Sequence, residues 1–404
     1  MIKIVYLVFY FVGQFQNIVC NDYCSIEGDK CNPRRYRYLL YDVNPPEGFN
    51  LRRDVYMRYA IFVHSLQKSS NKNLSKFKLV LPPWTNLYHW KEQQRLHIPW
   101  SHFFDLESLQ KFAPVIEMHN FFDSDDVMGP QYANLNIDNV YILQHYEDMF
   151  KTGQFEDKME FQKCNKPIRT NFYHYNNITS SNIKCLSFHG HAKDLEYIFK
   201  QSAAQTILID HAEVALHDHF GNSVFWQARR SMRFNKNLQK RALVFREKHL
   251  NSSNSHDNTQ LPEDWRDEIY KRTAKGGPYV GVHLRRRDYA VARSKDVPNL
   301  KNSARQIERT LKKLRLNTVF VATDAPVKEY EELKYLLSNY QVFRYTPDKY
   351  DKDGELAIID QIICSHARIQ EEREIMGFPV ETTFNRLCGD GDICEKPSMW
   401  KIIH

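Results

Sequence analysis

The chain has 404 residues, of which 42% are hydrophobic and 13% aromatic. A prior of about 150 residues per domain predicts two or three folded domains rather than one core. There are 56 lysines and arginines against 49 acidic residues, so the net charge of +7 is a mild excess spread along the chain. This distribution argues against a nucleic-acid-binding protein and favours a local site for an anionic ligand.

The N-terminus is typical of a signal peptide, which we assign to residues 1–20. Lys3 supplies the positive end, and residues 4–12 form an apolar run of suitable length. The run is too short to cross a bilayer, and we expect no membrane span elsewhere. The alternative is a buried first strand.

The eight cysteines suit a secreted or luminal protein. If Cys20 leaves with the signal, three pairs that are close in sequence and one buried thiol, Cys364, remain. The predicted disulfides are Cys24–Cys31, Cys164–Cys185 and Cys388–Cys394. Three sequons, at Asn73, Asn177 and Asn251, predict glycosylation and agree with the secretory pathway.

The first part of the chain, residues 21–245, begins with the pattern of a βαβ unit. We expect strands at 36–43, 77–81, 112–118 and 206–210, and helices at 51–68, 194–201 and 225–249. Residues 120–200 otherwise lack a clear period. The Ser/Asn-rich stretch 251–261 is predicted to be a surface loop or linker.

The second part, residues 246–404, alternates strands with helices. We expect strands at 279–283, 318–323 and 341–345 and helices at 302–314, 327–339 and 355–368. Short connections of this kind predict a parallel sheet with right-handed crossovers. The pattern requires a further strand after the last helix, but the residues beyond Arg368 do not look like one, so we expect this sheet to lack a strand.

Two segments carry the candidate chemistry. His283, Leu284 and Arg285 stand where a parallel strand ends, and an arginine there suits phosphate; a solvated basic loop is the alternative. Residues 45–50, Pro-Pro-Glu-Gly-Phe-Asn, display Glu47 before a helix, with Gly48 permitting positive φ or close approach of a ligand. Glu47 is either a helix N-terminal charge or a catalytic base facing Arg285.

Other acidic residues are secondary candidates. Asp324 ends a strand and is expected to cap the next helix rather than bind a nucleotide. Asp360 lies on an apolar helix face and needs a buried partner or the donor-rich edge of a base. Asp123 and Asp125, like Asp351 and Asp353, resemble fragments of metal-binding motifs, but turns explain them better.

Together these segments resemble the GDP-fucose protein O-fucosyltransferases, most closely the branch that modifies thrombospondin type 1 repeats. Besides 45–50, the resemblance rests on Gly281-Val-His-Leu-Arg-Arg-Arg-Asp288, on 357–368 and on the tail from Phe384 to Cys394. It implies a GT-B-like α/β fold in which two Rossmann-like domains face a cleft, and no required metal or cofactor. The implied acceptor is a folded thrombospondin type 1 repeat in the endoplasmic reticulum.

The resemblance also implies roles for individual residues. Glu47 matches the base of an inverting transfer, with Arg285 as its catalytic partner at the diphosphate. The matching positions for GDP-fucose are Pro46, Glu47, Gly48, Phe49, Asn50, His283, Leu284, Arg285 and Asp360.

One departure from the family leaves a second hypothesis. A nucleotide-contacting segment that the family carries after the helix is absent beyond Arg368. The chain is then either an active fucosyltransferase or a catalytically impaired isoform that acts as a luminal binding protein for such repeats. A fucosyltransferase acting on glycans is a third, weaker hypothesis.

Overall fold

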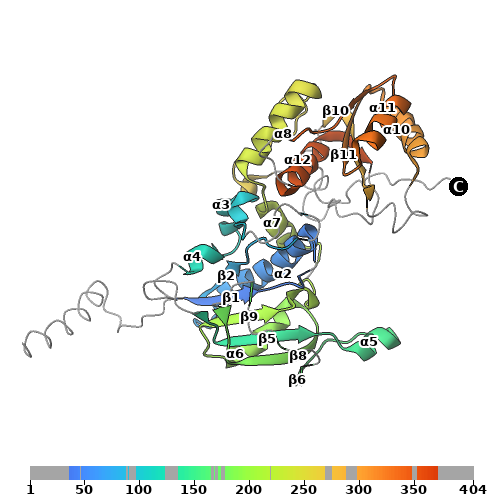
Figure 1. The fold of residues 1–404 in the computed structure, drawn as a ribbon. Helices are drawn as coiled ribbons and strands as arrows, with labels where there is room; N and C mark the ends of the chain where they lie inside the picture. Colours follow the sequence, from blue (N-terminus) through green and yellow to red (C-terminus); the bar gives the residue numbers. More distant parts are fainter. Residues whose placement is uncertain are drawn as a thin grey trace, which may run out of the picture.

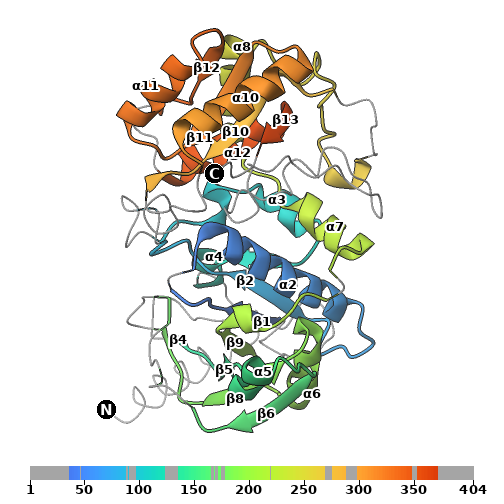
Figure 2. The ribbon, with the colours of Figure 1, turned by 90° about the vertical axis from the view of Figure 1, so that its right-hand side faces the viewer.

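The computed structural model contains two α/β units stacked one above the other (Figure 1). The structure describes residues 36–45, 47–87, 90, 97–122, 135–164, 168, 172–173, 178–218, 220–268, 275–287, 298–347 and 353–371. Figure 2 shows α2, α3 and α7 lying between the N-terminal sheet and the C-terminal unit. None of the helices in these ranges has the length and apolar character that crossing a membrane needs.

The N-terminal unit is built on a seven-stranded sheet in the order β3-β2-β1-β9-β5-β8-β6. Its strands are β1 (Arg37–Tyr41), β2 (Phe77–Leu81), β3 (Val115–Glu117), β5 (Asn139–Gln144), β6 (Lys158–Gln162), β8 (Ile183–His189) and β9 (Thr206–Asp210). All pairs are parallel except β6 with β8. Alternate β1 residues enter two different core clusters, Leu39 one and Leu40 the other, so both faces of the sheet are buried.

Helices and short strands complete this unit. They are α2 (Phe49–Gln67), α3 (Leu106–Gln110), α4 (Met118–Phe122), α5 (Glu147–Thr152), α6 (Glu196–Gln201), α7 (Ser223–Ser231), and the pair β4 (Leu135–Asn136) and β7 (Ile178–Thr179). The strands within 120–200 have no clear alternation in the sequence. β5 and β8 are largely buried along their length, and β6 is almost entirely exposed, so neither kind of strand gives a period of two. The predicted single helix over 225–249 is wrong, since the chain leaves the helix after Ser231 and starts a new one at Lys236.

The C-terminal unit has a four-stranded parallel sheet in the order β12-β11-β10-β13. Its elements are β10 (Gly277–Leu284), β11 (Thr318–Thr323), β12 (Gln341–Phe343), β13 (Ala367–Glu371), α10 (Leu300–Leu314), α11 (Val327–Leu336) and α12 (Asp353–Ser365). The helix α8 (Lys236–His249) packs against α12.

The expectation that this sheet lacks a strand is wrong. Directly after α12 the chain forms β13, which pairs in parallel with β10. Because β13 lies at the edge of the sheet, it tolerates polar residues that do not look like a buried strand in the sequence. Gly276, at φ +70°, lets the backbone approach β13, since a Cβ there would lie 2.4 Å from the Ala367 carbonyl oxygen.

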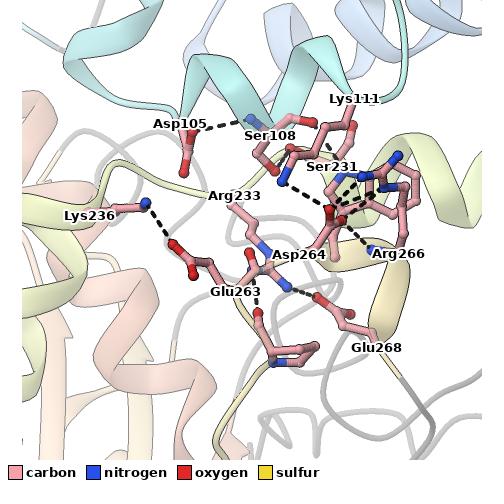
Figure 3. Close-up of polar contacts among 12 residues, drawn as sticks. Asp105, Ser108, Lys111, Ser231, Arg233, Lys236, Glu263, Asp264, Arg266 and Glu268 are labelled. Carbon is pink, nitrogen blue, oxygen red and sulfur yellow. Dashed lines mark hydrogen bonds and ion pairs between the residues drawn. The ribbon is translucent and has the colours of Figure 1, made fainter.

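The connection between the units is fixed by polar contacts, which Figure 3 shows. Lys111, at the end of α3, forms an ion pair of 3.0 Å with Asp264. Hydrogen bonds from Arg266, and then from Lys111, lower the pKa of Asp264 well below its usual range. Arg233 donates to the Glu268 carboxylate at 2.6 Å.

The predicted loop 251–261 contains a buried polar network. Arg246 and Asp257 are each 1% exposed and lie 3.3 Å apart, and Ser252 donates to the same carboxylate. The backbone carbonyl of Asp257 accepts from Lys275 and Gly276, just before β10. The loop is therefore a fixed part of the C-terminal unit.

Asp257→Ala should lower the free energy of unfolding by about 3 kcal/mol, because it leaves the Arg246 charge buried without its counter-ion. Asp148→Ala is the matched control; that carboxylate is 92% exposed and pairs with Lys151, so its removal should cost below about 0.5 kcal/mol. Urea unfolding of the disulfide-intact protein measures both. Equal effects for the two variants would contradict the role assigned to Asp257.

Of the predicted disulfides, Cys164–Cys185 is confirmed, with an S–S distance of 1.97 Å. Cys364 is a free buried thiol, as expected. The pairs Cys24–Cys31 and Cys388–Cys394, the signal peptide and Asn177 lie outside the described residues. Asn73 and Asn251 are exposed, so both sequons are accessible.

Candidate functional site

The Glu47 loop lies at the carboxyl end of β1 and leads directly into α2. Arg52 fixes the loop from within the helix, donating to the carbonyl oxygens of Pro45 and Glu47 at 3.0 Å each. The Glu47 backbone N–H donates to Asn44 at 3.0 Å. The Glu47 side chain is partly exposed, so a ligand can reach its carboxylate, while hydrogen bonds fix the backbone that carries it.

Gly48 is the N-cap of α2, with φ −79°. Positive φ is therefore not the reason for glycine here, and that part of the expectation is wrong. A Cβ at Gly48 would meet nothing within 4 Å, which leaves the space beside the loop open to a ligand. Pro46 lies outside the described residues.

Phe49 and Asn50 begin α2. The Phe49 ring is buried against Trp84 and Trp90, with centroids 4.8 and 5.0 Å away. Its side chain is thus part of the core, and contact with a donor would have to involve its backbone. Asn50 is partly exposed and accepts a long hydrogen bond of 3.4 Å from Arg53.

The second segment ends β10 at the carboxyl edge of the C-terminal sheet. Leu284 is buried in the core cluster around that sheet, and its carbonyl oxygen accepts from the Thr323 hydroxyl, so its side chain is not available to a ligand. Burial and the charge of Arg285 lower the pKa of His283 to about 3. His283 is therefore a neutral imidazole at physiological pH, which can donate one hydrogen bond and accept another.

Arg285 is partly exposed, whereas Arg286 has a structural role. The Arg286 backbone N–H donates to Asp324 at 2.5 Å, and its guanidinium donates to Glu329 at 2.6 Å. The helix that follows Asp324 has Pro326 as its N-cap and no side-chain cap, so the expectation that Asp324 caps it is wrong. Asp324 instead orients the backbone next to Arg285.

Asp360 lies in α12 and is 8% exposed. Its Oδ1 has no hydrogen-bond partner among the residues that the structure describes. Burial raises the pKa of Asp360 well above its usual value, and the charge of Arg344 opposes this shift. A buried carboxyl group with an unused oxygen suits a ligand that presents hydrogen-bond donors.

The helix α12 of the C-terminal unit contacts the N-terminal unit near the Glu47 loop. Gln361 of α12 accepts from Arg53 of α2 at 3.3 Å, and Glu355 lies 2.8 Å from His102. Gly354 packs so closely that a Cβ would lie 2.8 Å from the Phe103 ring and 3.0 Å from Trp90. Because Trp90 also contacts Phe49, the start of α12 lies beside the end of the Glu47 loop.

None of these contacts between the two units had a signal in the sequence. Arg53, His102 and Gln361 belong to no motif, and only the fold brings them together. Asp353 and Gly354, expected in a turn, form the start of α12. Asp123, Asp125 and Asp351 lie outside the described residues.

A family model described as GDP-fucose protein O-fucosyltransferase matches residues 38–369, which includes both candidate segments and α12. The chain belongs to this family. It is therefore a fucosyltransferase, and the alternative of a non-catalytic binding protein is not favoured.

Individual relatives support the same family membership. The chain is 42% identical over 398 residues to GDP-fucose protein O-fucosyltransferase 2 of Caenorhabditis elegans, covering 91% of this chain and 90% of that protein. It is 43% identical over 400 residues to the Homo sapiens protein of the same name, covering 92% and 90%.

Solved structures support the GT-B-type fold. A crystal structure of POFUT1 in complex with GDP-fucose aligns with a TM-score of 0.54 at 14% identity, covering 91% of this chain and 99% of that one. A complex with GDP aligns with the same TM-score at 13% identity, covering 92% and 100%. At this identity the likeness shows the shared fold alone.

Asp360→Asn should raise the unfolding temperature at pH 7, because the folded pKa of Asp360 is raised. Its stabilising contribution is complete below the unfolded pKa and is lost as the pH rises through the folded pKa. The gain from the neutral amide should therefore shrink toward pH 4. Thermal unfolding between pH 4 and 7 tests this, with the exposed Asp267→Asn as control. A gain that does not depend on pH would contradict the assignment.

Proposed function

We propose that the chain transfers fucose from GDP-fucose to serine or threonine hydroxyls of folded thrombospondin type 1 repeats. The observation that carries the proposal is that α12 contacts both units. Glu47 follows the carboxyl end of β1 in one unit, and Arg285 follows the carboxyl end of β10 in the other. The names of the relatives support GDP-fucose as the donor. The folded repeat as acceptor rests on the resemblance to the branch that modifies such repeats.

In the proposed mechanism Glu47 removes the proton of the acceptor hydroxyl. The hydroxyl oxygen attacks the anomeric carbon of fucose while the bond from that carbon to the diphosphate oxygen breaks, and GDP leaves. Attack opposite the leaving group inverts the configuration at this carbon. Arg285 stabilises the negative charge that develops on the leaving phosphate.

Other residues bind and orient the donor in this proposal. Neutral His283 donates a hydrogen bond without adding a charge beside Arg285. Asp360 accepts from the donor-rich edge of the guanine base, which gives its unpaired Oδ1 a partner. The backbone of residues 48–50 contacts the donor next to Gly48, where no side chain occupies the space. The reaction as written needs no metal or other cofactor.

We place the reaction in the lumen of the endoplasmic reticulum. The features that support this location are the predicted signal peptide, the Cys164–Cys185 disulfide and the accessible sequons. A folded, disulfide-bonded acceptor would be encountered in the same compartment.

Glu47→Ala and Arg285→Ala should each reduce fucose transfer by at least about 100-fold, because one removes the base and the other the charge that stabilises the leaving group. The exposed Arg309→Ala is the matched control and should retain activity. Transfer of labelled fucose to a purified repeat measures the effect, with circular dichroism confirming the fold. Unchanged turnover in either site variant would remove that residue from the mechanism.

Donor binding separates the enzyme from the binding-protein hypothesis. The wild-type chain and Glu47→Ala should both bind GDP with micromolar affinity in calorimetry, because the proposed base does not contact the guanine. Asp360→Ala should weaken binding by at least about tenfold. Failure of the wild-type chain to bind GDP would contradict the proposed donor site.

An acceptor panel tests the substrate class and the stereochemistry. We expect transfer to a folded repeat, and none to its reduced, unfolded form or to free glycans. The product should show an anomeric configuration opposite to that of the donor in NMR spectra. Retention of configuration would overturn the single-displacement mechanism, and transfer to free glycans would overturn the acceptor assignment.

A further inference from the structure

The edge strand β6 buries little of its side-chain surface. Four of its five residues are exposed, and among the described strands its partner is β8, in antiparallel register. One end is covalently fixed, because Cys164 follows β6 and forms a disulfide with Cys185 of β8. The other end of β6 follows Asp157 and lies opposite the end of β8. His189 and His191, separated by Gly190, lie at that end of β8.

Four side chains with metal-ligating atoms meet at that second end. Asp157 lies 3.6 Å from His189, measured from Oδ1 to Nδ1, and 3.8 Å from His191, measured from Oδ2 to Nδ1. His191 Nδ1 lies 3.8 Å from Asp194 Oδ2. The ligating atoms of Asp157, His191 and Asp194 all lie within 4.8 Å of one another.

These separations are too long for hydrogen bonds but suit ligands that share an ion. Bonds of about 2.1 Å to a tetrahedral zinc place neighbouring ligand atoms roughly 3.4 Å apart. His189 Nδ1 is buried and has no hydrogen-bond partner among the described residues. Small side-chain movements would therefore complete a coordination shell without breaking a contact of that nitrogen.

The local charge also favours a cation. Asp157 and Asp194 bring two carboxylates to one imidazole ring, that of His191. The buried Asp218 lies nearby and accepts from the backbone N–H of Lys193. Burial raises the pKa of Asp218, and the charge of Asp194 contributes in the same direction. The backbone hydrogen bond from Lys193 and the charges of Lys193 and His191 oppose this shift.

We propose that Asp157, His191 and Asp194, with His189 beside them, bind a zinc-type divalent cation that fastens the start of β6 to the end of β8. Imidazole nitrogen favours a transition metal, whereas calcium prefers six to eight oxygen ligands. The disulfide and the cation would then secure the two ends of the same edge strand.

The cation would also fix a protruding segment. Residues 145–157, which include α5, extend from the sheet in Figure 1 and end at Asp157. They carry the exposed aromatic residues Phe150 (58%) and Phe155 (52%), whose ring centroids lie 5.3 Å apart. Phe155 stacks on His189 at 5.3 Å, so the aromatic contacts lead directly to the proposed site.

The site is separate from the proposed chemistry. In the sheet order, β8 is three strands from β1, which is about 14 Å at the usual strand spacing. The bound cation is therefore structural, and the proposal does not depend on the proposed function.

Metal binding by the untagged, EDTA-treated full chain tests the proposal. Zinc calorimetry should show one site, and cobalt should give the visible absorption of a tetrahedral complex, while calcium and magnesium should not compete. Asp157→Asn and His191→Gln should each weaken zinc binding at least tenfold. Asp148→Asn and His119→Gln are matched controls at exposed positions and should bind like the wild type.

Hydrogen exchange supplies a readout on the segment itself. Zinc should slow exchange of the amides in residues 145–162 in the wild type but not in Asp157→Asn. The proposal is overturned if calorimetry detects no zinc binding at about 100 µM zinc, or if both site variants bind zinc as tightly as the wild type. It is also overturned if zinc leaves hydrogen exchange in residues 145–162 unchanged.

Discussion

The packing of α12 against both units is the constraint on which the candidate site depends. Its first turn has no side chain at Gly354, so the Phe103 and Trp90 rings can contact the helix backbone directly. Two turns later, Gln361 accepts from the buried Arg53. Because α12 also packs on β10 and α8, it fixes the carboxyl edge of one sheet relative to the other.

Arg53 shows how a buried cation can stabilise such an interface. Its guanidinium lies over the rings of Phe49, Phe104 and Phe234 at 5.2 to 5.7 Å, in addition to its hydrogen bond to Gln361. Delocalised charge suits contact with aromatic faces, and the planar donors still reach across the interface. The aromatic core beneath the Glu47 loop is thereby connected to the helix that carries Asp360.

Asp360 is unfavourable for the stability of the fold but suits the binding of a ligand. A buried carboxyl group without a hydrogen-bond partner lowers the free energy of unfolding, whereas a ligand with hydrogen-bond donors would satisfy it. Arg246 and Asp257 are a useful contrast, because those two buried charges satisfy each other within the fold. The unsatisfied group lies on α12, the helix that contacts both units, whereas the satisfied pair lies in a structural loop.

Local period and short spacing in the sequence encode the strand–helix alternation from Tyr279 to α12, the Cys164–Cys185 pairing and the segments around Glu47 and Arg285. That β13 completes the second sheet became evident from the folded structure, since an edge strand needs no apolar pattern. Only the tertiary structure decided that Asp324 supports Arg286 and that Arg53 meets Gln361. Those contacts join residues far apart in the chain, so no local pattern encodes them.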